Sequence, residues 1–170
     1  MDTDGRPICY MLMGIQVSGK SSFAQDRFPF VLRLSRDLLG SQNASAGNRQ
    51  HHLFYALLAT QTTFVFDNTN LTAGGREHWL APLRAAGYRI EGFYFEPDVE
   101  RCQERNAGRP RPLPPKAILG AAAKWQTPTR EEGFDELTEV GLGRDLLRGE
   151  PVYILNPSAL PKPGASCATS

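Results

Sequence analysis

Short apolar runs alternate along the chain with longer segments whose apolar residues recur at helical spacing. Runs of four to eight apolar residues are typical of buried strands, and the wider spacing is typical of helices packed on a sheet. The expected strands cover residues 8–13, 31–34, 63–66 and 88–95, with weaker patterns at 136–140 and 152–155. The expected helices begin at residues 21, 49, 76, 97 and 116 and end near 27, 60, 86, 106 and 125. This alternation predicts an α/β protein with a parallel sheet.

The segments between these elements have loop composition. Residues 40–47 are rich in Ser, Asn, Ala and Gly, and residues 107–115 are rich in proline, so both are expected to be loops. Residues 143–149 are expected to form one or two helical turns. We expect a single domain over residues 1–156 and a disordered tail over 157–170, because the tail contains few apolar residues to bury.

Composition narrows the class of protein. The 170 residues are 41% hydrophobic and 22% charged, as in ordinary globular domains. Neither an apolar run of membrane-spanning length nor a signal-peptide pattern is visible, and no obligate protein partner is evident. Cys9, Cys102 and Cys167 are too scattered for a metal site or a disulfide framework, so a reducing cytoplasm is expected. A net charge of +1 neither demands nor excludes nucleic acid.

Residues 14–21 read Gly-Ile-Gln-Val-Ser-Gly-Lys-Ser and match the phosphate-binding pattern G-x-x-x-x-G-K-[ST]. The match lies between an expected strand and an expected helix, so the loop amides and the helix N-terminus can hold phosphate oxygens. Lys20 should reach the β- and γ-phosphates, and the Ser21 hydroxyl should hold Mg²⁺. The expected nucleotide site consists of Gly14, Ile15, Gln16, Val17, Ser18, Gly19, Lys20, Ser21 and Ser22.

Two aspartates follow expected strands, at the sheet edge where open α/β proteins bind ligands. Asp37 can accept the proton of a hydroxyl that attacks the γ-phosphate, or it can cap a helix. Asp67 can belong to the Mg²⁺ shell, or it can orient Ser21 and Lys20. A third reading of Asp67 is a simple Asn/Asp-rich turn.

Residues 101–111 contain four arginines and one glutamate, a local charge of +3. The prolines in and after this run prevent a continuous helix. Arginines can stabilise the charge of a migrating phosphoryl group, and a loop that closes over the nucleotide excludes water. The sequence therefore predicts a kinase lid over about residues 105–115 that carries Arg105, Arg109 and Arg111.

Four motifs in fixed order, GIQVSGKSS, SRDLLGS, FDNTN and RNAGRPRP, resemble the polynucleotide 5′-kinase family. That family includes the phage enzyme, the kinase domain of the animal polynucleotide kinase/phosphatase and stand-alone bacterial kinases of the same type. The resemblance covers roughly residues 8–140. It implies a P-loop NTPase three-layer sandwich with a mainly parallel central sheet and a helical lid. It also implies ATP and Mg²⁺ as cofactors and a 5′-hydroxyl nucleic acid as acceptor.

The resemblance assigns roles to matching positions. Lys20 and Ser21 match the phosphate- and magnesium-binding pair, and Asp37 matches the general base for the 5′-hydroxyl. Asp67 matches the segment between donor and acceptor, while Arg109, with Arg105 as a second arginine, matches the lid contact to the ATP phosphates.

The chain also departs from the family pattern. Gln16-Val17 stands where the family has Pro-Gly, and Gly40 replaces the arginine that the phage-type enzyme uses on the acceptor phosphate. Two other functions therefore remain open. One is a kinase for a sugar, nucleoside or antibiotic hydroxyl, and the other is a nucleotide-binding regulatory NTPase without an acceptor.

Overall fold

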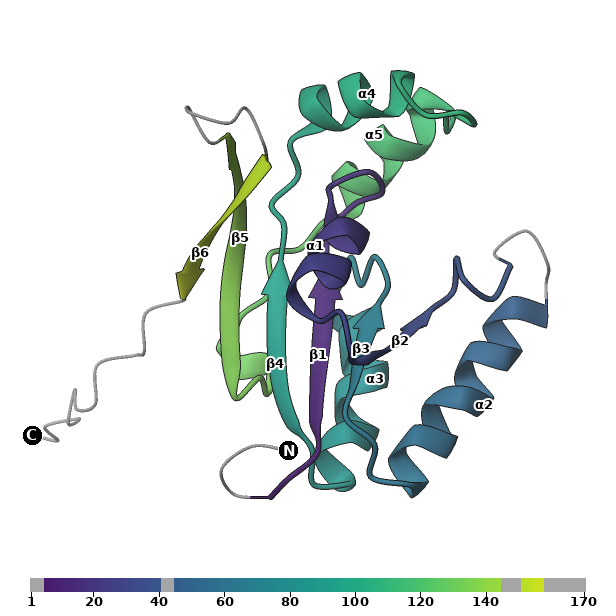
Figure 1. Cartoon of the computed structure of the whole chain (residues 1–170), viewed down its shortest axis with the longest axis vertical. Coiled ribbons are helices and arrows are strands. Elements are labelled where there is room, and N and C mark those ends of the chain that lie inside the picture. Colours follow the sequence, from purple (N-terminus) through teal and green to yellow (C-terminus); the bar gives the residue numbers. More distant parts are fainter. Residues whose placement is uncertain (1–4, 41–44, 145–150, 158–170) are drawn as a thin grey trace, which may run out of the picture.

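The computed structural model describes residues 5–40, 45–144 and 151–157, and these form one twisted sheet with helices on both faces (Figure 1). The sheet has six strands in the order β2-β3-β1-β4-β5-β6. The strands are β1 (Ile8–Met13), β2 (Leu32–Ser35), β3 (Phe64–Asp67), β4 (Arg89–Tyr94), β5 (Glu136–Arg144) and β6 (Pro151–Pro157). The first five pair in parallel, and β6 pairs antiparallel with β5 at the edge.

Five α-helices and one 3₁₀ turn connect the described strands. They are α1 (Lys20–Arg27), α2 (Ser45–Ala59), α3 (Ala73–Ala85), α4 (Val99–Ala107), α5 (Pro115–Lys124) and η1 (Arg130–Glu132). Figure 1 shows α2 and α3 on one face of the sheet and α1 on the other, with α4 and α5 together beyond one end of the strands. Among the described helices, none is both long and apolar enough to cross a membrane.

The apolar residues of the central strands fill two layers. Phe54 of α2 and Leu80 of α3 pack with Phe66 and other strand residues on one face. Phe23 of α1 packs with Val65 and other strand residues on the opposite face. The strands are apolar on both sides because helices cover both sides. The expected α/β P-loop architecture, a three-layer sandwich with a mainly parallel sheet, is confirmed.

A third, smaller cluster lies at the end of the sheet beside α4 and α5. Ile15 of the β1–α1 loop is fully buried there against Cys102 of α4 and Ile118 of α5. Cys9 and Cys102 are both free and buried, as core thiols should be, and burial raises the pKa of each thiol. Cys167 lies outside the described residues.

Several expected boundaries are wrong. Helix α2 begins at Ser45, so the expected loop at 40–47 fails over its last three residues. Strand β5 continues to Arg144 because it pairs with β6, so Gly143 and Arg144 are extended rather than helical, and residues 145–149 lie outside the described chain. Pro157, which was assigned to the tail, ends β6, and residues 158–170 are not described. Helix α4 begins at Val99, capped by Asp98, rather than at Pro97. The single-domain division at residue 156 stays a prediction.

Candidate active site

The β1–α1 loop has the backbone shape of a phosphate-binding loop. Gly14 (φ 152°) and Gly19 (φ 100°) take positive φ values that favour glycine. A Cβ at position 14 would lie 3.0 Å from Phe95 Cβ and 3.2 Å from the Phe95 carbonyl oxygen, so only glycine fits beside that segment. Gly19 is the N-cap of α1 and offers no side-chain acceptor. The first amides of α1 therefore remain available to an anion.

The substitution of the family's Pro-Gly has a visible consequence in this loop. Val17 takes φ 64°, a left-handed conformation that β-branched residues avoid. Its side chain packs against the buried cluster of Ile15, Cys102 and Ile118, and that contact offsets the backbone cost. The neighbouring Gln16 side-chain oxygen is buried without a hydrogen-bond partner. The loop thus keeps its shape without a glycine at position 17. The Val17 side chain packs beside Cys102 of α4 and Ile118 of α5.

Lys20 is a buried cation without an ion-pair partner among the described residues. Its Nζ donates to the carbonyl oxygens of Gly14 (2.8 Å) and Ile15 (2.7 Å) and to Ser18 Oγ (3.3 Å). Its side chain is only 7% exposed, and within the described chain no carboxylate lies at ion-pair distance from it. Burial lowers the Lys20 pKa to about 8, against the opposing charges of Asp67 and Asp37. An incoming phosphate would supply the missing negative charge.

Ser21, in the first turn of α1, meets Asp67 at the carboxyl end of β3. The Ser21 hydroxyl donates to Asp67 Oδ2 at 3.0 Å, and Asp67 is the last, buried residue of β3. Asp67 therefore belongs to a buried strand end rather than to an Asn/Asp-rich turn, and its role in the site stays a prediction. A serine hydroxyl and a carboxylate oxygen in contact are ligands of the kind that Mg²⁺ prefers. The pair fits a magnesium ion bound with nucleotide phosphates.

Arg33 was not recognised from the sequence. It extends from β2, donates from Nη1 to the Ser21 carbonyl oxygen (3.2 Å) and places Nε 3.8 Å from Asp67 Oδ2. That Nε is buried and has no hydrogen-bond partner. Its position in the short alternating strand resembled an ordinary outward-facing residue, so only the tertiary structure reveals it. Arg33 supplies positive charge beside the Asp67 carboxylate.

Asp37 lies in a turn that follows β2. Its backbone N–H is 3.3 Å from the accepting Ser35 Oγ, its carbonyl oxygen accepts from the Gly40 amide (3.3 Å), and its side chain is exposed. Residues 36–40 form a turn rather than the start of a helix, so the helix-cap reading is wrong. Asp37 follows the carboxyl end of β2, which runs parallel to β3 and β1, so it lies at the same end of the sheet as the phosphate loop. Its exposure leaves it free to meet an acceptor.

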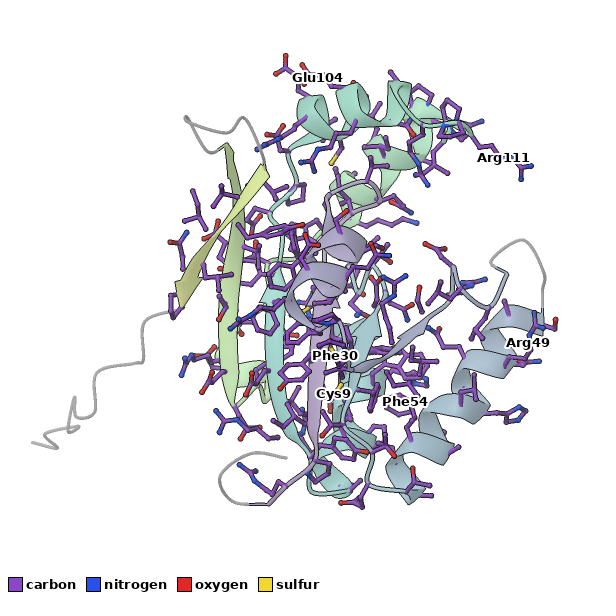
Figure 2. The ribbon with its side chains drawn as sticks, viewed as in Figure 1. Cys9, Phe30, Arg49, Phe54, Glu104 and Arg111 are labelled. Atoms are coloured by element: carbon purple, nitrogen blue, oxygen red, sulfur yellow. The ribbon has the colours of Figure 1, made fainter. Side chains whose placement is uncertain are left out.

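The predicted lid, about residues 105–115, covers the end of α4, the connecting loop and the first residue of α5, and its function as a lid stays a prediction. A Cβ at Gly19 would lie 3.2 Å from Arg105 Nη1 and 3.3 Å from Leu142 Cδ1, so Arg105 already contacts the phosphate loop. Arg109 is exposed on the connecting loop, and its role stays a prediction. Figure 2 shows Glu104 and Arg111 pointing away from the sheet, into solvent. Of the arginines expected to bind phosphate, the structure brings Arg105 to the loop.

The lid loop is closed by one side chain. Asn106 is 5% exposed, and its amide donates to the Leu113 carbonyl oxygen (2.7 Å) while its oxygen accepts from the Leu113 amide (2.8 Å). The residues between them, which include Arg109 and Arg111, form a loop whose two ends are joined. At the other end of the lid, the Glu96 carboxylate accepts from Trp125 Nε1 (3.0 Å) and Thr127 Oγ1 (2.7 Å).

A pocket of about 140 Å³ opens beside the phosphate loop. Ser18 of the loop, Phe95 after β4, Arg101 and Arg105 of α4, and Leu142 of β5 contribute to its walls. Arg101 Nη1 donates to the Leu142 carbonyl oxygen at 2.6 Å, which ties the lid helix to the β5 wall. Glu96, Asp98 and Glu139 also line this pocket, so five of its eleven lining residues are charged.

Two further residues missed from the sequence hold the segment after β3. Gln50 of α2 exchanges hydrogen bonds with the Asn68 side chain (2.9 and 3.3 Å). Arg76 of α3 is fully buried, pairs in bidentate fashion with Glu132 (2.6 and 2.8 Å) and donates to the carbonyl oxygens of Asn70 and Gln126. The sequence around each residue shows only the apolar spacing of an amphipathic helix. It therefore contained no sign of these polar contacts.

The chain resembles known proteins in sequence and in fold. The chain is 26% identical over 137 residues to a bifunctional polynucleotide phosphatase/kinase of Schizosaccharomyces pombe, a match that covers 76% of this chain and 32% of that protein. It therefore spans about a third of the length of this curated relative.

Solved structures share the fold at low identity. A gluconokinase from Sinorhizobium meliloti 1021 aligns with a TM-score of 0.57 at 15% identity, over 79% of this chain and 82% of that one. Kti12 from Chaetomium thermophilum, in complex with ADP-AlF3, aligns with a TM-score of 0.61 at 16% identity, over 82% and 92%. These likenesses show a kinase-like P-loop fold. The model of the AAA_33 family, described as an AAA domain, matches residues 10–129, more than half of the sequence, so this chain belongs to that family.

Proposed function

We propose that this chain is an ATP-dependent kinase that transfers the γ-phosphoryl group to an alcohol, the 5′-hydroxyl of a polynucleotide. The observation that carries the proposal is the Ser21–Asp67 hydrogen bond beside the buried Lys20 ammonium, with the exposed Asp37 carboxylate after the neighbouring strand end of β2. The polynucleotide acceptor is supported by the printed name of the curated relative and by the four ordered motifs.

The loop binds the donor by supplying positive charge. Lys20 would exchange its carbonyl partners for β- and γ-phosphate oxygens, and the amides that follow Gly19 would hold the β-phosphate. Ser21 and Asp67 would hold the Mg²⁺, which neutralises phosphate charge when bound. Arg33 limits the negative charge around Asp67.

Asp37 is the base in this proposal. Its carboxylate accepts the proton of the acceptor hydroxyl as that oxygen bonds to the γ-phosphorus, while the bond between the γ-phosphorus and the bridging oxygen breaks and ADP leaves. Arg105, already beside Gly19, and Arg109 would stabilise the charge on the migrating group.

The test removes the base while keeping the donor site. An Asp37→Asn variant should lose about 10²-fold or more of phosphate transfer from labelled ATP to a 5′-hydroxyl oligonucleotide, the usual size of a general-base contribution. Its ATP dissociation constant should stay close to that of the parent protein. Glu104→Gln, which removes a carboxylate that points into solvent on the lid, is the matched control and should transfer normally.

Other outcomes would replace the proposal. Transfer to sugars or nucleosides but not to the oligonucleotide would identify a small-molecule kinase. ATP hydrolysis that ignores added alcohols and survives the loss of the Asp37 carboxylate would identify a regulatory NTPase.

A further inference from the structure

Arg33 places a cation beside the carboxylate of the proposed magnesium site. It lies on β2, the strand at one edge of the sheet, and pairs in register with Val65 of β3, two residues before Asp67 (Figure 1). Paired residues of neighbouring strands and alternate residues of one strand share a face, so Arg33 and Asp67 leave the sheet on the same face. The Arg33 side chain is 18% exposed and that of Asp67 is 4% exposed.

The Arg33 guanidinium is hydrogen-bonded to the first turn of α1. Its Nη1 donates to the Ser21 carbonyl oxygen at 3.2 Å. Its Nε lies 3.8 Å from Asp67 Oδ2, too far for a hydrogen bond, and is buried without a hydrogen-bond partner in the part of the chain that the structure describes. Asp67 Oδ2 accepts instead from the Ser21 hydroxyl at 3.0 Å. Through its Nε, Arg33 therefore acts on the carboxylate by charge alone.

A second cation, Lys20, also acts on Asp67. Burial lowers the pKa of the Lys20 amine, and the negative charge of Asp67 opposes that effect. Asp37, the other carboxylate that acts on this amine, is exposed to water. Two cations thus face one buried carboxylate, and a divalent ion that entered alone would be repelled by both of them. A nucleoside triphosphate brings several negative charges and removes that imbalance.

We propose that Arg33 is a positioning residue that acts through Asp67 and keeps the Ser21–Asp67 pair from binding a divalent cation unless nucleotide phosphates arrive with it. The positive charge beside the carboxylate weakens its attraction for a free metal ion, and the phosphates add both oxygen ligands and negative charge. The inference rests on the proposed magnesium site. It adds that metal and nucleotide enter together, and it depends on neither the acceptor nor the transfer step.

Metal binding without nucleotide tests the inference. Mn²⁺, which suits the same oxygen ligands as Mg²⁺, is titrated against the nucleotide-free protein, and the free ion is measured by electron paramagnetic resonance. Arg33→Met should lower the Mn²⁺ dissociation constant about tenfold, because a monovalent and a divalent cation on one carboxylate repel by about that factor even with the screening of bulk water. Arg33→Lys keeps the charge and should bind Mn²⁺ like the parent. Arg27→Met, which removes an exposed arginine at the end of α1, is the matched control and should change binding less than about twofold, since salt screens an exposed charge.

The direction of the change separates charge from structure. Loss of a merely structural arginine would loosen the Ser21–Asp67 pair and weaken metal binding, so weaker or equal Mn²⁺ binding by Arg33→Met would overturn the inference. Thermal unfolding gives a second readout, because a ligand of the folded state stabilises it in proportion to how tightly it binds. Added Mn²⁺ should raise the unfolding temperature of Arg33→Met more than that of the parent. Arg33→Gln, whose amide can still donate to the Ser21 carbonyl oxygen, repeats the test if Arg33→Met does not fold.

A second change shows whether the effect acts through Asp67. In the Asp67→Asn background, Arg33→Met should bring no gain in Mn²⁺ binding, and an equal gain there would overturn the inference. The magnesium site itself is tested separately, by the gain in affinity for β,γ-methylene-ATP when Mn²⁺ is added. If Asp67→Asn leaves that gain unchanged, the proposed site fails and the inference fails with it. If Asp67→Asn reduces the gain while Arg33→Met binds Mn²⁺ alone like the parent, only the inference fails.

Discussion

Raising the pH should weaken nucleotide binding through the buried Lys20 amine. All three N–H bonds of the ammonium are directed at loop oxygens, and burial lowers its pKa to about 8. A bound triphosphate adds negative charge beside the amine and should raise its pKa again. Above pH 8, binding therefore requires the uptake of a proton.

The size of the effect follows from the pKa. With the free amine titrating near 8 and the bound amine returned to the ordinary lysine value of 10.5, the binding constant should be about tenfold smaller at pH 9 than at pH 7. About 0.9 proton should be taken up per nucleotide at pH 9 and about 0.1 at pH 7. The nucleotide-free protein should show the opposite trend in stability. Between pH 8 and 10.5 the unfolded lysine holds a proton that the folded one lacks, so this group's contribution to the free energy of unfolding rises with pH.

Isothermal titration calorimetry with ATP and Mg²⁺, without acceptor, measures both quantities when it is repeated in two buffers of different ionisation enthalpy. Lys20→Met is the control and should bind weakly at both pH values without proton uptake. Equal affinity at pH 7 and pH 9 in the parent, or no proton uptake at pH 9, would show that burial does not lower the pKa of Lys20 in the nucleotide-free protein.

Two stability predictions follow from buried contacts. Arg76→Met should lower the free energy of unfolding by about 3–5 kcal/mol in urea denaturation, because it leaves the Glu132 carboxylate without its cation. Arg84→Met breaks an exposed pair with Glu77 and should cost at most about 1 kcal/mol. Equal losses would mean that burial does not decide the value of these pairs. Gly92→Ala should cost about 1–3 kcal/mol by thermal or urea unfolding, since its Cβ would lie 2.7 Å from Leu137 Cδ1. Gly120→Ala, in open space on α5, should stabilise by up to about 1 kcal/mol, and a loss there would contradict the packing argument.

The phosphate loop and the strand-end carboxylates could be predicted because they depend on local order. A strand, a glycine loop and a helix start within 20 residues fix where Lys20 and Ser21 lie, and parallel pairing brings the end of β3 beside β1. The Ser21–Asp67 contact follows from that register.

The buried Arg76 could not be predicted in the same way. Its partner Glu132 lies 56 residues away, and a helical arginine followed by a glutamate suggests an ordinary solvated surface. The choice of partner depends on how the segment after α5 returns to the sheet, which local patterns do not specify. Arg33 and Gln50 were missed for the same reason.

Two element boundaries, the start of α2 and the end of β5, were predicted wrongly in segments that contain glycine. In α2, Gly47 and its small neighbours suggested a loop, yet Ala46 is fully buried and Gly47 is helical. The expected strand at 136–140 ended before Gly141 and Gly143, yet both glycines pair with β6. A glycine can therefore lie within a paired strand instead of marking its end.

The amide bridge from Asn106 to Leu113 has a consequence for the proposed kinase lid. Because the arginine-bearing segment is tied into a ring when the protein folds, little conformational entropy would be lost there when a nucleotide binds, and only the long side chains would become ordered. If this segment closes over the nucleotide as proposed, it would move as one stiff unit, and loss of the bridge should slow binding more than it weakens the final complex.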